Sequence, residues 1–133
     1  MTIQYLIDTD WAIYYLNGQQ RIVKRLHELQ PYGCLALSII SLAELYEGVY
    51  YSRNREEDER ALHDFLLGLT ILGIDERISQ VFGKERGRLR SLGTIIADFD
   101  LLIGATAIRN NLVVLTNNRC HFERIKDLRI ESL

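Results

Sequence analysis

The stretch Tyr-Leu-Ile-Asp-Thr-Asp-Trp-Ala at residues 5–12 decides the fold, because an apolar, β-prone run gives way there to helix-capping residues. A second stretch, Ala-Asp-Phe-Asp-Leu-Leu-Ile-Gly-Ala-Thr-Ala at residues 97–107, also places paired carboxylates where a helix begins. Carboxylates within about 4 Å of one another repel by roughly 4 kcal/mol per pair at an effective dielectric near 20, so such a group needs a bound cation. Hard oxygen ligands at this density favour Mg²⁺ or Mn²⁺.

Strand and helix signals alternate along the rest of the chain. The expected strands are residues 3–7, 35–38, 70–74, 112–115 and 128–131. The expected helices are residues 11–16, 22–29, 41–49, 53–69, 76–92 and 98–110, the last two separated by a turn at Gly93. Strands repeatedly separated by helices imply right-handed crossovers. The sequence therefore predicts an α/β fold with three α/β/α layers around a mostly parallel sheet of four to five strands.

Composition indicates one ordinary globular domain over residues 1–133, with 47% hydrophobic and 26% charged residues. The N-terminus lacks a basic leader and the apolar run at 34–43 is too short to cross a bilayer, so we expect a cytoplasmic protein without a membrane partner. Cys34 and Cys120 have no metal-ligand spacing, and we expect both to be buried thiols.

The net charge of −2 argues against broad, sequence-independent wrapping of nucleic acid. A polyanion would have to meet a local patch, and the densest basic segment is residues 84–90. Its cations fall on two neighbouring stripes of a helix. An ordinary solvated helix surface explains the same pattern.

Each candidate carboxylate also has a purely structural interpretation. Asp8 and Asp98 stand where helix N-caps are expected, and the Ser41-x-x-Glu44 spacing is that of a capping box. Capping does not explain why these carboxylates follow strands whose carboxyl ends meet on one rim of the sheet. Thr116 ends the fourth expected strand on the same rim, in what is otherwise an Asn-rich turn.

These residues resemble the PIN-domain ribonucleases, specifically the VapC-type toxins of prokaryotic toxin–antitoxin pairs. The motifs that carry the resemblance are Leu-Ile-Asp-Thr-Asp at 6–10, Ser-Leu-Ala-Glu-Leu at 41–45, the Gly-to-Asp block at 93–107, and Val-Leu-Thr-Asn-Asn to Phe at 114–122. The match spans essentially the whole chain, and four motifs in order at fitting spacings are specific.

The resemblance implies a metal-dependent endoribonuclease that hydrolyses RNA phosphodiester bonds with water activated by Mg²⁺ or Mn²⁺. It implies that Asp8, Glu44 and Asp100 are the catalytic, metal-binding acids, with Asp98 as an auxiliary ligand.

For this activity we expect Thr116 and Asn118 to position the substrate or a ligand. The candidate RNA contacts are Arg86, Arg88 and Arg90 of the basic segment. The family usually carries a fourth acid in the closing motif, where this chain has Asn117, Asn118 and His121. This departure bears on whether the site holds a second metal ion.

The resemblance also implies partners: an RNA substrate, a second copy in a homodimer, and a small antitoxin protein whose segment lies over the acidic crevice, often reaching it with an Arg.

Two other functions remain open from the sequence. One is a haloacid-dehalogenase-like phosphatase with Asp8 as nucleophile, although Ala12 stands where that class carries Thr or Val. The other is a PIN-like binding module without turnover, which the missing fourth acid would favour.

Overall fold

Five parallel strands form the sheet of the computed structural model, which describes residues 2–133. The spatial order is β3-β2-β1-β4-β5, so β1 lies at the centre. In register, Ile7 of β1 pairs with Leu37 of β2 on one side and with Leu115 of β4 on the other. The strands are β1 (Tyr5–Ile7), β2 (Leu35–Ser38), β3 (Thr70–Leu72), β4 (Val113–Leu115) and β5 (Arg129–Glu131).

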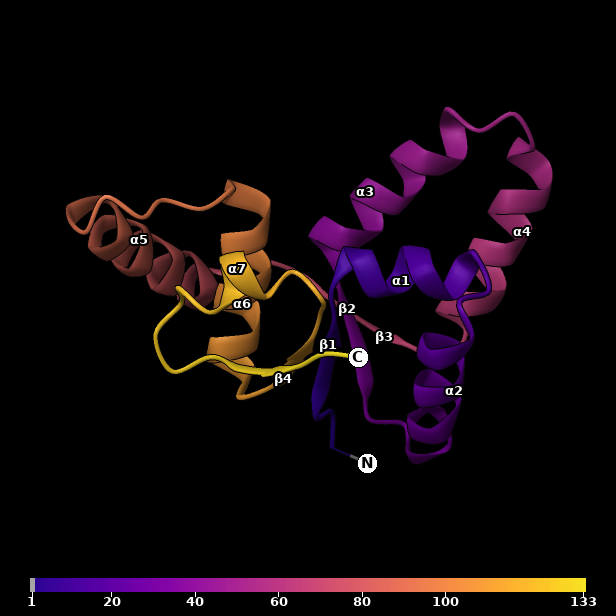
Figure 1. Ribbon diagram of the computed structural model, residues 1–133, viewed down its shortest axis with the longest axis horizontal. Helices are drawn as coiled ribbons and strands as arrows, with labels where there is room; N and C mark the ends of the chain where they lie inside the picture. The colour runs from indigo at the N-terminus through magenta and orange to yellow at the C-terminus, as the bar shows by residue number, and fades with distance from the viewer. Residues whose placement is uncertain (1) are drawn as a thin grey trace.

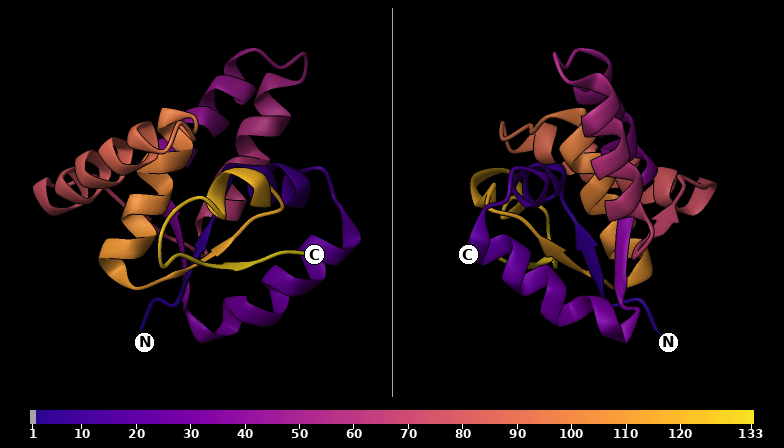
Figure 2. Two further views of the ribbon diagram at one scale, coloured as in Figure 1. Left: turned by 60° about the vertical axis from the view of Figure 1, so that its left-hand side comes forward. Right: turned by 90° about the vertical axis from the view of Figure 1, so that its right-hand side faces the viewer.

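Helices cover both faces of this sheet, as Figure 1 and Figure 2 show. On one face lie α1 (Thr9–Leu16), α2 (Gln20–Leu29), α3 (Ile39–Tyr50) and α4 (Arg55–Leu66), with a 3-10 turn at Gln30–Tyr32 after α2. On the other lie α5 (Glu76–Ser91), α6 (Asp98–Asn110) and α7 (Arg119–Phe122). The predicted three-layer α/β/α arrangement is therefore confirmed, with a sheet that is parallel throughout the described residues.

Two hydrophobic cores form because successive strand side chains point to opposite faces. Ile7 and Leu115 pack with Trp11 under α1–α4, whereas Leu6 and Val114 pack on the opposite face under α5–α7. All five side chains have no measurable exposure to solvent. The strands are thus apolar on both faces, as expected for buried parallel strands.

Several local expectations need correction. The N-cap of α3 is Ser38, whose Oγ accepts from the backbone N–H of Ile40 at 3.1 Å. Ser41 is buried inside the helix, so it does not form a capping box with Glu44. Helix α6 is preceded by Ala97 as N-cap, and Asp98 is its first residue rather than its cap.

Two further features differ from expectation. Residues 119–122 form the short α7, which the sequence pattern did not reveal. Cys34 is buried as expected, but Cys120 on α7 is exposed. The predicted end of α5 is confirmed, because Gly93 adopts the left-handed conformation (φ 69°) that terminates helices.

The strand order contains a switch point between β1 and β4. The chain proceeds outward from β1 through β2 to β3, then returns to the other side of β1 for β4 and β5. Segments that follow β1 and β4 therefore diverge to opposite faces and leave a crevice at the carboxyl ends of these strands. No helix within residues 2–133 is long and apolar enough to cross a membrane.

Candidate metal centre

The residues that directly follow β1 and β4 meet at the switch point. The Thr116 hydroxyl donates to Oδ2 of Asp8 at 2.7 Å. The same hydroxyl oxygen lies 3.3 and 3.4 Å from the two carboxylate oxygens of Asp10. One buried hydroxyl therefore links two carboxylates, and it connects two parts of the chain 108 positions apart.

Asp10 is fixed in this group by backbone donors. Its Oδ1 accepts from the N–H of Trp11 at 2.7 Å, and its Oδ2 accepts from the N–H of Asn117 at 3.0 Å. Our sequence-based ligand set did not include Asp10. The available signal was its position in the first turn of α1, two residues after Asp8, but an acid there also favours the helix dipole without any site.

Asp8 is the most perturbed acid of the group. Its side chain is 4% exposed, and burial together with the negative charges of Asp10 and Asp100 raises its pKa from 3.8 to about 7, against the lowering effect of the Thr116 hydrogen bond. No Lys, Arg or His in the described chain forms an ion pair with Asp8. The ionised form of Asp8 therefore lacks a positive partner within residues 2–133.

Asp100 lies in the first turn of α6, and two side chains of the β4–α7 segment hold its carboxylate. Its Oδ2 lies 2.7 Å from Nδ1 of His121 and 3.2 Å from Nδ2 of Asn118. Asn118 also donates its backbone N–H to the Thr116 hydroxyl at 3.0 Å. His121 stands in the closing motif, where the family usually carries its fourth acid, but the sequence pattern did not predict its contact with Asp100, which lies 21 positions away on another helix.

Glu44 reaches the same region from α3 through a different contact. Oγ1 of Thr9 donates to Oε1 of Glu44 at 2.7 Å and lies 2.8 Å from Oγ of Ser41. Thr9 directly follows Asp8, so this bond places Glu44 beside the acidic group rather than in a capping box.

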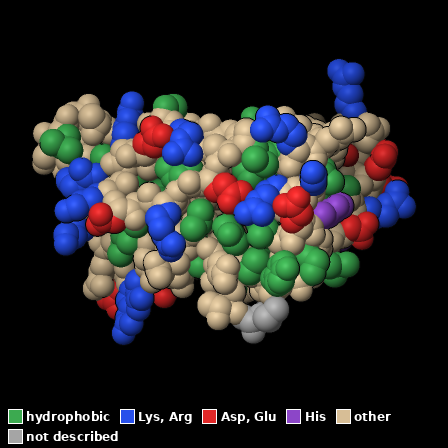
Figure 3. Space-filling model, turned by 60° about the horizontal axis from the view of Figure 1, so that its bottom comes forward, with side chains coloured by type: hydrophobic (Ala, Val, Ile, Leu, Met, Phe, Trp, Pro, Cys, Tyr) green, Lys and Arg blue, Asp and Glu red, His purple; other side chains and the backbone are tan. Residues whose placement is uncertain are grey.

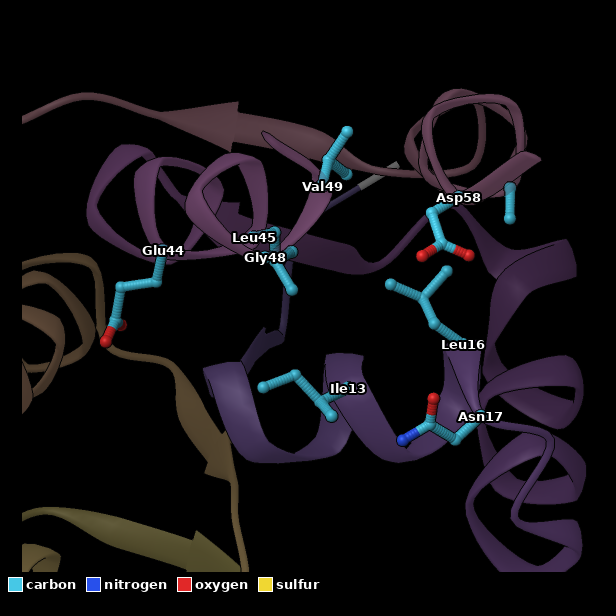
Figure 4. Close-up of a pocket in the computed structure, with 9 residues that line it drawn as sticks. Ile13, Leu16, Asn17, Glu44, Leu45, Gly48, Val49 and Asp58 are labelled. Atoms are coloured by element: carbon cyan, nitrogen blue, oxygen red, sulfur yellow. The ribbon is translucent and has the colours of Figure 1, made fainter. Parts of the chain in front are cut away.

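A pocket of about 200 Å³ extends from Glu44 between α1, α3 and α4. Figure 4 shows the Glu44 carboxylate at one end of this pocket, with Ile13 and Leu16 on α1 and Asp58 at the α4 end. Its lining is thus apolar in the middle and acidic at both ends. The lining residues are Ile13, Leu16, Asn17, Glu44, Leu45, Gly48, Val49, Asp58 and Ala61.

Asp98, the predicted auxiliary ligand, and Asn117 of the closing motif have other contacts. Asp98 accepts from Nε of Arg86 at 2.9 Å, in an ion pair between α6 and α5 that is separate from the Asp8 group. Asn117 accepts from the Trp11 indole N–H at 3.0 Å and donates to the backbone oxygen of Leu133 at 2.9 Å, so it fixes the turn after β4.

The predicted RNA-contacting arginines lie on α5 but differ in their contacts. Arg88 donates to both carboxylate oxygens of Glu85, at 2.7 and 2.8 Å, and to the backbone oxygen of Arg124. Arg90 is exposed and forms no side-chain hydrogen bond within residues 2–133. Figure 3 shows Lys and Arg side chains spread over this face of the molecule, including its left-hand end, where α5 lies.

The donor set fits a hard divalent cation. It consists of carboxylate and hydroxyl oxygens around a buried acid, Asp8, whose pKa is raised first by burial and then by the negative charge of Asp10. Within residues 2–133 no three His, Cys, Asp or Glu side chains already stand at ligand distance from one point. The carboxylates of Asp8 and Asp100 are instead held by hydrogen bonds from Thr116, Asn118 and His121.

An all-parallel sheet with carboxylates at its switch point defines a class of α/β proteins suited to divalent-cation chemistry. The profile of the PIN domain matches residues 5–128. "Ribonuclease VapC2" of Rickettsia felis is 34% identical over 129 residues, which cover 96% of both chains.

Two solved structures agree with this match. A crystal structure of VapBC2 from Rickettsia felis bound to a DNA fragment superposes with a TM-score of 0.91 at 33% identity, covering 100% of this chain and 99% of that chain. A DNA-bound VapBC structure from Salmonella typhimurium gives a TM-score of 0.91 at 29% identity, covering 98% of each chain. The chain therefore belongs to the PIN domain family, among the VapC ribonucleases, and the resemblance predicted from the sequence is confirmed.

The buried Asp8 predicts a pH-dependent stability of the metal-free protein. Because folding raises the pKa of Asp8 from 3.8 to about 7, its ionisation destabilises the fold progressively as pH rises between these values. We expect Asp8→Asn to be more stable than the wild type at pH 8, by at most an amount on the order of 4 kcal/mol, and to lose this advantage near pH 4.

Urea denaturation at several pH values in the presence of a chelator measures this difference. The matched control is Asp64→Asn, because Asp64 is an exposed acid of α4. A difference between Asp8→Asn and the wild type that does not change with pH would contradict the prediction.

Proposed function

We propose that this protein is an Mg²⁺- or Mn²⁺-dependent endoribonuclease that cleaves RNA in the cytoplasm and is the toxin of a toxin–antitoxin pair. The observation that carries the proposal is the buried Asp8, gathered with Asp10 and near Asp100 at the switch point of a PIN-family sheet. The VapC ribonucleases among its relatives, at 34% identity over nearly the whole chain, support the choice of RNA as substrate.

Each residue has a distinct part in this proposal. Asp8 and Asp100 hold the cation, and Glu44, oriented by the Thr9 hydroxyl, is a further ligand or orients the attacking water. The bound cation supplies charge neutralisation at the phosphoryl oxygens and a water that is nucleophilic at neutral pH. Thr116 positions Asp8, and Asn118 positions Asp100 next to the scissile phosphate.

Of the two other functions that the sequence left open, the family match argues against the phosphatase and does not test the binding module. A haloacid-dehalogenase-like phosphatase does not agree with the PIN-family match over residues 5–128. A binding module without turnover has the same fold as an active nuclease, so only an assay separates them. Hydrogen bonds hold the carboxylates of Asp8 and Asp100 in the crevice, and this arrangement favours the enzyme over the binding module.

Replacement of the acids should abolish RNA cleavage. We expect Asp8→Asn and Asp100→Asn each to reduce the cleavage rate by more than the roughly 100-fold that marks loss of an outer-shell partner of a metal. Chelation should stop the wild type, and Mg²⁺ or Mn²⁺ should restore it. The measurement is cleavage of a labelled single-stranded RNA by the purified protein.

Asp64→Asn serves as the control that keeps the wild-type rate, since Asp64 is exposed on α4. A wild-type protein that binds RNA but cleaves none, with either metal present, would overturn the enzyme in favour of the binding module.

Among the three predicted arginines of α5, Arg90 is the best placed to contact RNA, because Arg88 is held by Glu85 and Arg86 by Asp98. We expect Arg90→Gln to weaken binding of unrelated single-stranded RNAs equally. The slope of log affinity against log salt should become shallower by about 0.7, the value for one lost phosphate contact on a single strand. Fluorescence anisotropy at several salt concentrations measures the slope, with Arg60→Gln on α4 as the control. An unchanged slope in Arg90→Gln would exclude this contact.

The partners in the proposal are a small antitoxin and, from the family resemblance, a second copy of the chain in a homodimer. The solved VapBC complexes support the antitoxin. The pocket beside Glu44 suits a segment with apolar side chains for its centre and basic side chains for its acidic ends, Glu44 and Asp58.

An arginine placed in this pocket should weaken the antitoxin complex, with inhibition of each variant measured relative to its own uninhibited cleavage rate. Ile13 lines the pocket and is 44% exposed, so Ile13→Arg should be compatible with the fold. We expect it to weaken inhibition by the cognate antitoxin at least about tenfold, because it removes apolar contact and repels basic side chains. Ile71→Arg is the control, since Ile71 is 37% exposed on β3, outside the pocket. Equal inhibition of both variants would argue against this docking place.

A further inference from the structure

Asp100, Asn118 and His121 form a closed group at the α6–α7 side of the crevice. Oδ2 of Asp100 lies 2.7 Å from Nδ1 of His121 and 3.2 Å from Nδ2 of Asn118, while the two nitrogens lie 3.2 Å apart. The Asp100 side chain is only 20% exposed, and that of His121 is 36% exposed. In the proposed function Asn118 positions Asp100, whereas His121 has no assigned role.

The hydrogens of this group can be assigned from its chemistry. An ionised carboxylate only accepts hydrogen bonds, so Nδ1 of His121 must carry a hydrogen and donate it to Asp100. The Asn118 amide donates to the same oxygen. The contact between the two nitrogens therefore joins two donors and is not a hydrogen bond. This assignment holds whether the imidazole is neutral or protonated.

Two N–H groups directed at Oδ2 leave Asp100 with one oxygen for a metal ion. A cation that approached Oδ2 would meet both hydrogens, whereas Oδ1 has no hydrogen-bond partner in the described residues. A carboxylate that bridges two cations commonly uses one oxygen for each. Asp100 held in this way can serve one cation only.

On the α6–α7 side of the crevice, the described residues around Asp100 offer no further free carboxylate for a second cation. Asp98, two residues earlier, is engaged by Arg86. Asn117 faces Trp11 and Leu133, and Asn118 and His121 present N–H groups. The closing motif therefore brings donors, not a fourth carboxylate, to this side of the crevice.

We propose that Asn118 and His121 clamp Asp100 as a single-oxygen ligand and thereby restrict the site to one divalent cation. His121 is a positioning residue in this proposal, since it acts on the cation through Asp100. The inference rests on the proposed function, because that function supplies the cation, and it adds the number of ions and the residue that sets it.

Mn²⁺ binding measured by EPR and by calorimetry tests the inference without relying on cleavage. We expect the wild type to bind one Mn²⁺ per chain, with no spectral sign of two coupled ions. His121→Asp adds a carboxylate and removes the donor, and we expect it to bind two. His121→Ala should still bind one Mn²⁺. Its Kd for Mn²⁺ should rise about 10- to 100-fold, the effect of losing a residue that hydrogen-bonds to a metal ligand. Its Tm should change little.

Two further variants separate this role from a general effect. His121→Gln retains an N–H donor and should recover most of the Mn²⁺ affinity lost in His121→Ala. His27→Asp introduces the same charge at an exposed histidine of α2 and should still bind one ion. If His121→Asp does not fold, the wild-type stoichiometry and the contrast between Ala and Gln still decide the question.

The outcomes distinguish this inference from the proposed function. Two coupled Mn²⁺ ions in a wild type that cleaves RNA would overturn the clamp but leave the ribonuclease intact. One ion in both the wild type and His121→Asp would also overturn it, because the added carboxylate would then make no difference. A wild type that binds no Mn²⁺ would overturn the proposed function and the inference together.

Discussion

The burial of the Asp8 carboxyl group beside other acids is the constraint on which the rest of the site depends. Asp8 follows the central strand, where helices on both faces exclude water, and the charges of Asp10 and Asp100 add to the cost of its ionisation. Within residues 2–133 neutral donors such as Thr116 offset this cost only in part. A divalent cation would offset the cost of ionising Asp8 fully. The electrostatic cost that weakens the metal-free fold therefore favours metal binding.

The positions of the acids along the sequence made the fold and the rim of the site predictable. Apolar strands that end at an acid or a hydroxyl are visible from the order of residues in the sequence, as at Asp8 and Thr116. Parallel pairing then requires these ends to lie on one edge, which the register of β1 with β4 confirms. The helix boundaries were less predictable. Ser38 and Ser41 both fit the N-cap of α3, and the sequence does not show that β2 ends at Ser38 and the helix begins directly after it.

The contacts within the site could not be predicted in the same way. Asp10 has the sequence signature of a helix-dipole acid, and only the return of β4 beside β1 brings it to Thr116. His121 joins Asp100 because α7, too short to give a periodic pattern, packs against α6. The pairing of Asp98 with Arg86 likewise depends on how α5 lies against α6, and periodicity does not specify this packing.

A divalent cation bound between the carboxylates at the switch point can be located in a crystal of the protein grown or soaked with Mn²⁺, with data collected for anomalous scattering. We expect an anomalous peak in contact with both Asp8 and Asp100 and near Glu44. A well-ordered structure at saturating Mn²⁺ with no peak at these carboxylates would contradict cation binding at the switch point.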